Sequence, residues 1–129
     1  MSATTAPRGA YVCAKNNVRW DPNDPDKEGW LYKKSRWVGD WRERYFVLKG
    51  SKLFFCKNER EAPHGMINLV DCVSAKDADD KAKRSFALEL VLHDERFFLC
   101  AESEVQKSSW LSAVHRSIEK HSSVMSSQG

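Results

Sequence analysis

The stretch GWLYKKSRWVGDWRERYFVLKG, residues 29–50, decides the fold of this chain. Apolar and polar side chains alternate in it on both sides of a Gly39-Asp40 turn, and alternation is the signature of a strand with one buried face. The pattern predicts two antiparallel strands, over residues 29–36 and 41–50, joined by a short loop.

Five more segments downstream have the composition of short strands separated by turn residues. The expected strands cover residues 52–57, 64–70, 71–77, 85–92 and 95–101. Closely spaced strands with short connections are typical of antiparallel architectures. We therefore expect a mainly β fold: a seven-stranded antiparallel sandwich or partly open barrel.

After residue 101 the period changes from that of a strand to that of a helix. Ser103 and Gln106 form a capping-box pattern, which marks a helix start. Apolar residues then recur at helical spacing, with polar residues between them, at Val105, Trp110, Leu111, Val114 and Ile118. The sequence predicts one C-terminal amphipathic helix over roughly residues 104–120, closing the barrel through Trp110.

The two ends differ from this central block. Residues 1–27 are polar and turn-rich, with Pro22 and Pro25 opposing regular structure, so we expect a flexible tail and a lead-in on which Trp20 packs. Residues 122–129 have the composition of a disordered end, which leaves one domain over residues 28–121. No secretory signal is recognisable, so we expect reduced cysteines and a cytoplasmic location.

The net charge of +3 is unevenly distributed. Residues 27–52 contain eight cations and three carboxylates, a sum of +5, so the rest of the chain sums to −2. Such a concentration of charge marks a surface that meets an anion. The cations are Lys27, Lys33, Lys34, Arg36, Arg42, Arg44, Lys49 and Lys52.

Strand alternation brings three of these cations together. If Leu31 faces the core, Lys33 shares its face, and if Phe46 faces the core, so do Arg42 and Arg44. The two strands are antiparallel neighbours, so the three cations should gather at one rim of the barrel. Neither strand places a carboxylate on that face. Three like charges held this close together favour the binding of an anionic ligand such as phosphate. The alternative interpretation is a solvated basic edge.

The order and spacing of these motifs resemble those of the pleckstrin-homology (PH) family. The resemblance covers residues 29–121 and extends to small stand-alone PH proteins of plants. It rests on four features: Gly29 to Lys33, Trp41 to Leu48, Lys52 to Phe55, and Trp110 in the last helix.

The resemblance implies a non-catalytic module that binds phosphoinositides and is recruited to membranes. In family members that bind these lipids, a lysine in the first strand and a basic pair in the second hold the inositol phosphates. Lys33, Arg42 and Arg44 match those positions, and the loop adds Lys34 and Arg36. The family also implies a signalling or trafficking role at the endosomal or plasma membrane. The sequence has no catalytic motif, and none of its histidines has a carboxylate or cysteine at metal-ligand spacing, so we expect no catalysis, no cofactor and no metal.

Two positions depart from the strongest lipid binders of the family. Phe55 stands where a tyrosine is common, and His64 stands where an arginine often precedes the glycine of the fourth strand. Both changes remove hydrogen-bond donors, although His64 gains a charge when protonated. The lipid selected therefore stays open.

The loop between the first two strands has an apolar tip, at Trp37 and Val38. An indole suits the bilayer interface because it is apolar and also a donor, so this loop is a candidate membrane contact. The alternative is that Trp37 folds back on the barrel wall.

Two other functions compete with lipid binding. A protein-interaction or adaptor role is compatible with the same fold, with weak or non-specific lipid binding. Nucleic-acid binding is disfavoured, because Trp41 and Tyr45 alternate with Arg42 and Arg44 and so point away from the basic face.

Overall fold

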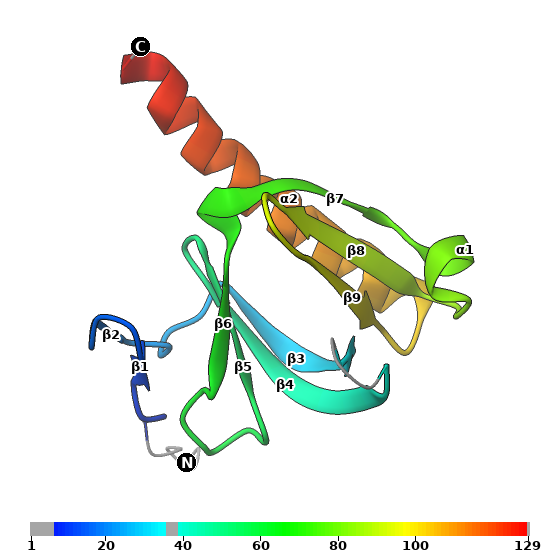
Figure 1. The fold of residues 1–129 in the computed structure, drawn as a ribbon, viewed down its shortest axis with the longest axis horizontal. Helices are drawn as coiled ribbons and strands as arrows, with labels where there is room; N and C mark the ends of the chain where they lie inside the picture. The colour runs from blue at the N-terminus through cyan, green and yellow to red at the C-terminus, as the bar shows by residue number, and fades with distance from the viewer. Residues whose placement is uncertain (1–6, 36–38, 129) are drawn as a thin grey trace, which may run out of the picture.

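The computed structural model describes residues 7–35 and 39–128, with side chains as far as residue 120. Seven strands form one antiparallel sheet in the order β6-β5-β4-β3-β9-β8-β7, and α2 packs across it (Figure 1). The sheet strands are β3 Lys27–Lys34, β4 Trp41–Lys49, β5 Lys52–Cys56, β6 Gly65–Asn68, β7 Cys72–Asp77, β8 Ala87–Leu92 and β9 Arg96–Cys100. The other elements are β1 Tyr11–Val12, β2 Arg19–Trp20, η1 Leu69–Asp71, α1 Asp79–Ala82 and α2 Glu104–Gln128.

The sheet curves into a barrel that stays open. Its edge strands, β6 and β7, follow each other through η1 but are not hydrogen-bonded neighbours. The predicted mainly β fold with a C-terminal helix is confirmed, in its open form.

The concave face of the sheet holds the core. Leu31, Phe46 and Leu48 are almost completely buried there, as the alternation predicted. The same core takes in Trp110, which is 3% exposed, so the predicted packing of α2 is confirmed. The aromatic ring of Trp110 lies against Gly29 and under the Lys27 ammonium, at the start of β3. Since Lys33 lies at the other end of β3, α2 closes the end of the barrel opposite the predicted rim.

The start of α2 has the predicted capping arrangement. Ser103 Oγ accepts the main-chain N–H of Gln106 at 3.2 Å, and Gln106 Oε1 accepts the N–H of Glu102 at 3.0 Å. The first bond satisfies a donor that the first turn leaves unpaired, and the second ties Gln106 back to the residue before Ser103.

Two features differ from the sequence prediction. The helix continues to Gln128 instead of ending near residue 120, so the end predicted to be disordered, residues 122–129, is helical as far as Gln128. The chain there contains no proline, and no glycine precedes Gly129, so nothing in the backbone interrupts the hydrogen-bond ladder. The charged loop predicted after β7 contains the short helix α1.

The lead-in is ordered over the residues described. Its hairpin, β1 and β2, lies on the convex face of the sheet, where Tyr11 and Trp20 pack on Val47, Phe54 and Cys56. The prediction that Trp20 packs on the domain is confirmed. This packing also explains why Val47 and Phe54 are buried although they point away from the main core.

Candidate functional site

The strand register brings the three predicted cations together. Lys33 pairs directly with Arg42, and Leu31 pairs with Arg44. Directly paired residues of antiparallel strands share a face, so all three cations lie on the core-facing side, beyond the last buried residues. We call Lys33, Arg42 and Arg44 the basic rim.

Lys33 rests on aromatic rings. Its Nζ atom lies 5.0 Å from the centroid of Phe55 and 5.3 Å from that of Phe97. Both distances are within the range in which a ring face attracts a cation. The aliphatic stem of Lys33 therefore covers the edge of the core, while the ammonium is presented at the rim.

Phe55 forms the floor of the rim together with its neighbours. Its ring packs on Phe46 at a centroid distance of 5.8 Å and meets the imidazole of His64 edge-on at 5.1 Å. It also covers Gly65, its partner across β5 and β6, where a side chain would collide with the ring. Gly65 is thus required because the Phe55 ring occupies the space of its missing side chain.

His64 belongs to the same electrostatic neighbourhood. Desolvation lowers its pKa, and so do the positive charges of Arg44, Lys57 and Lys33, in that order, whereas Glu61 acts the other way. His64 and Lys33 both contact the ring of Phe55, which places His64 beside the rim.

Arg42 and Arg44 complete the rim on β4. The side chain of Arg42 is exposed and that of Arg44 is half-buried. Arg44 donates through Nη1 to the main-chain carbonyl of Glu43 at 2.8 Å. The rim therefore presents two guanidinium forks and an ammonium to one region of solvent, a set suited to several phosphate oxygens.

Sequence reasoning missed Lys57 and Glu61. Lys57 follows Leu53 and Phe55 at the spacing of one strand face, so alternation extended past the end of β5 would have found it. Glu61 comes from the loop after β5, and its proximity to His64 has no signal in the pattern of strands.

Other cations of residues 27–52 lie elsewhere. Lys34 is on the opposite face, with Nζ 5.8 Å from the centroid of Phe98, so the structure does not bring it into the rim. Three more cations have partners at the far end of the hairpin. Lys27 lies over the ring of Trp110, and Lys49 lies 3.7 Å from Asp21. Lys52 lies over the ring of Trp20 and donates a hydrogen bond to Asn68. The predicted contacts Arg36, Trp37 and Val38 fall outside the described residues.

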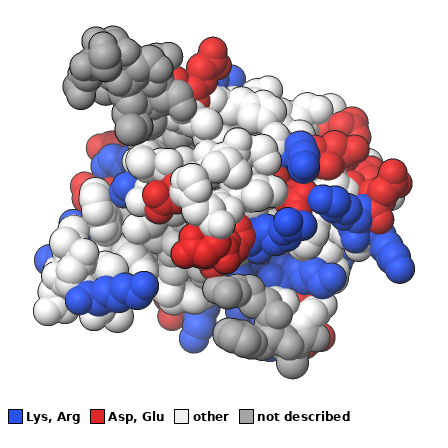
Figure 2. Space-filling model, turned by 45° about the horizontal axis from the view of Figure 1, so that its top comes forward, with Lys and Arg blue, Asp and Glu red and all other residues white. Residues whose placement is uncertain are grey.

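On the face shown in Figure 2, one group of Lys and Arg side chains lies at and to the right of the centre, next to Asp and Glu side chains, and further cations lie along the left side. Among the described residues, no helix combines the length and the apolar character needed to cross a bilayer.

Comparison with known proteins places this geometry in a family. The family model "PH domain" matches residues 25–119. The "Pleckstrin homology domain-containing protein 1" of Arabidopsis thaliana is 36% identical over 106 residues, which cover 78% of this chain and 73% of that protein. A RAC family serine/threonine-protein kinase homolog of Dictyostelium discoideum is 34% identical over 65% of this chain, which corresponds to only 19% of the kinase homolog.

Solved structures agree with the sequence matches. The C-terminal PH domain of pleckstrin, in complex with D-myo-Ins(1,2,3,4,5)P5, is 25% identical and superposes with a TM-score of 0.61. The match covers 71% of this chain and 96% of that domain. The solution structure of the PH domain of human KIAA0053 protein gives a TM-score of 0.65 at 26% identity, covering 74% and 89% of the two chains. The fold, the motifs and these matches agree, and the chain belongs to the PH domain family.

Proposed function

We propose that this chain is a non-catalytic module that binds the headgroups of phosphoinositides at the basic rim and so associates peripherally with membranes. The observation that carries the proposal is the register, which sets Lys33 opposite Arg42 and puts Arg44 on the same face. The inositol phosphate complex of the pleckstrin domain supports the ligand class, since that domain shares this fold.

The rim accounts for binding in physical terms. Each guanidinium or ammonium contact with a phosphate is a charge-assisted hydrogen bond, worth about 1.5–3 kcal/mol. The aromatic floor of Phe55 and Phe97 fixes Lys33, which limits the entropy that a ligand must overcome. The endosomal or plasma membrane is the proposed location, and the loop tip at Trp37 and Val38 is the proposed membrane contact.

The test is a liposome-binding panel that covers all phosphoinositides, with phosphatidylserine as the control for general charge. Replacing Arg44 with alanine should weaken phosphoinositide binding about tenfold or more, since one charge-assisted contact of this size is lost. A matched control is Arg116→Ala, which removes an exposed cation from α2. Unchanged phosphoinositide binding by a folded Arg44→Ala protein would contradict the site.

The second candidate is an adaptor function, in which the domain binds a protein and holds lipid weakly. The phenylalanine at position 55 and the histidine at position 64 favour it, because phenylalanine has no donor and a neutral histidine has one where an arginine has five. Equal binding to phosphatidylserine and to every phosphoinositide would support this candidate.

A further inference from the structure

The convex face of β3 and β4 carries a second group of functional side chains, on the opposite side of the sheet from the basic rim. Trp30 and Tyr45 are directly paired there, with ring centroids 5.4 Å apart in an edge-to-face arrangement. Both rings remain partly exposed. Partly exposed aromatic rings beside charged groups are typical of surfaces that bind other proteins.

Carboxylates surround these rings, and neutral hydrogen-bond donors hold the carboxylates in place. Tyr45 donates its hydroxyl hydrogen to Glu28 at 2.8 Å, and the Trp30 indole N–H is 3.3 Å from Glu59 Oε1. The side-chain amide of Asn58 donates to Glu61 at 3.0 Å. A neutral donor fixes a carboxylate without cancelling its charge, so each keeps oxygens and negative charge for a further, cationic donor.

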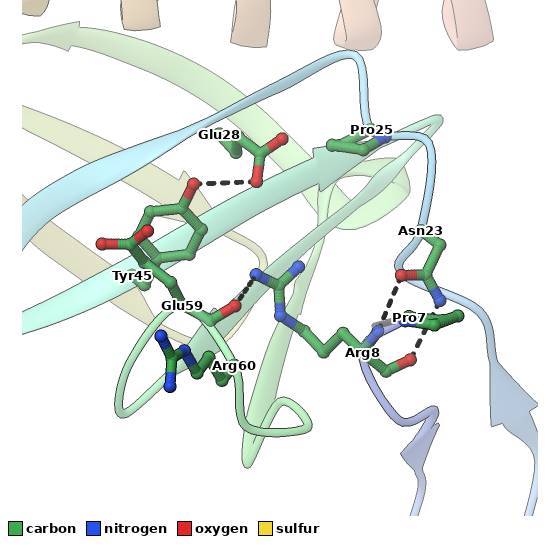
Figure 3. Close-up of a pocket in the computed structure, with 8 residues that line it drawn as sticks. All are labelled: Pro7, Arg8, Asn23, Pro25, Glu28, Tyr45, Glu59 and Arg60. Carbon is green, nitrogen blue, oxygen red and sulfur yellow. Dashed lines mark hydrogen bonds between the residues drawn. The ribbon is translucent and has the colours of Figure 1, made fainter. Parts of the chain in front are cut away.

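The chain itself shows which chemistry this face accepts. Arg8, from the lead-in, places its guanidinium carbon 5.3 Å from the centroid of the Tyr45 ring and donates to the main-chain carbonyl of Glu59 (Figure 3). A clasp with Asn23 holds Arg8 in this position: its N–H donates to Asn23 Oδ1, and its carbonyl accepts from Asn23 Nδ2, both at 2.9 Å. One arginine is thus already bound between an aromatic ring and the loop that follows β5.

Two hollows adjoin Glu59 on this face. The first, of about 360 Å³, contains Arg8 on its wall and is the pocket drawn in Figure 3. The second, of about 400 Å³, is lined by Trp30, Asn58, Glu59, Arg60 and Glu61. It combines an aromatic ring with two carboxylates against one cation, Arg60, whose side chain extends away from Arg8 in Figure 3.

We propose that this convex face is a protein-docking surface, and that the hollow beside Trp30 takes an arginine side chain from an extended segment of a partner. Charge complementarity supports this occupant, since Glu59 and Glu61 outnumber Arg60 there. A guanidinium can stack on the indole while its planar fork reaches a carboxylate, whereas an ammonium lacks that fork. The surface also continues the face on which the lead-in already lies, so a partner segment would extend an existing contact.

This proposal does not depend on lipid binding, because the two surfaces lie on opposite faces of the hairpin. The test uses the full chain labelled with ¹⁵N and a short capped peptide of alternating glycine and arginine. The reporter is the indole N–H resonance of Trp30, assigned by its loss in Trp30→Phe. The arginine peptide should shift this resonance saturably. A peptide with citrulline at each arginine position keeps the shape without the charge and should bind about tenfold more weakly or not at all.

Matched variants separate this hollow from general charge. Glu59→Gln with Glu61→Gln removes two carboxylates but keeps hydrogen-bond acceptors at both positions, and it should weaken the arginine peptide about tenfold or more. Glu104→Gln with Glu119→Gln makes the same change of charge at exposed sites on α2 and should leave binding unchanged.

Three results would overturn the proposal: no shift of Trp30, equal shifts with the citrulline peptide, or equal weakening in both double variants. A shift of Trp30 that depends on protein concentration without peptide would assign the face to a second copy of the chain, and would overturn it too.

Discussion

Replacing Gly65 with alanine tests whether the core and the basic rim are coupled through one aromatic ring. A Cβ atom at this position would lie 2.1, 2.3 and 2.9 Å from three carbons of the Phe55 ring. Ordinary contacts between carbon atoms are about 3.5–4.0 Å, so the ring must move by more than about 1 Å. It has little room, because Phe46 and His64 pack on it from other directions.

The expected change in the free energy of unfolding follows from two opposing effects. Overpacking of this kind costs about 1–3 kcal/mol of the free energy of unfolding. Alanine also restricts the unfolded chain more than glycine does, which contributes about 0.4–1 kcal/mol in the stabilising direction. We expect Gly65→Ala to destabilise the domain by about 0.5–2 kcal/mol, and to weaken phosphoinositide binding because Lys33 rests on the displaced ring.

Urea unfolding measures the loss of stability, and Gly29→Ala is the matched control. Gly29 is also in a strand, but its added Cβ atom would meet the nearest atom of Trp110 at 3.7 Å, an ordinary contact. This control should leave the free energy of unfolding unchanged or raise it slightly. A double-mutant cycle completes the test: in a Phe55→Ala background, Gly65→Ala should no longer destabilise. Equal stabilities of the two glycine variants, or an undiminished penalty without the Phe55 ring, would refute the reasoning.

Two more predictions concern α2 and His64. Trp110→Ala should cost about 3–5 kcal/mol, since the buried indole closes the barrel, and thermal unfolding that hardly changes would contradict this role. Desolvation and the nearby cations lower the pKa of His64, so the free domain keeps this side chain neutral until the pH falls below the range in which an ordinary histidine titrates. A bound phosphate would favour the charged form, so liposome affinity should rise as pH falls through this region, and His64→Gln should lose the increment. Parallel pH curves for the two proteins would show that His64 takes no part.

The strands and the core could be predicted from the sequence because their pattern is local. Alternation around Leu31, Phe46 and Leu48 identifies the buried face without knowledge of any partner strand, and turn residues mark where the strands end. The lead-in hairpin could not be predicted in the same way. Its strands have two residues each, too few for a period, and they are fixed by long-range packing of Tyr11 and Trp20.

The basic rim was predictable to the extent that it depends on alternation. Lys33, Arg42 and Arg44 follow from two neighbouring strands. The aromatic floor does not, because Phe97 reaches Lys33 only when β9 pairs with β3, a contact across more than sixty residues of sequence. Alternation applied strictly would also have put Lys34 on the opposite face from Lys33, where the structure has it.

The same alternation gives the β3–β4 hairpin two faces of opposite character. Lys33 and its rim partners carry positive charge on the concave side, whereas Glu28 and the aromatic pair lie on the convex side. Phosphate and an arginine-bearing segment would therefore approach one hairpin from opposite directions. Substitutions of Trp30 should leave binding at the rim intact, whereas Glu61 adjoins both surfaces, because it lines the hollow beside Trp30 and lies close enough to His64 to act on its pKa. If the proposed lipid contacts are correct, the basic rim and the loop tip would meet the membrane, and the convex face would stay open to a partner.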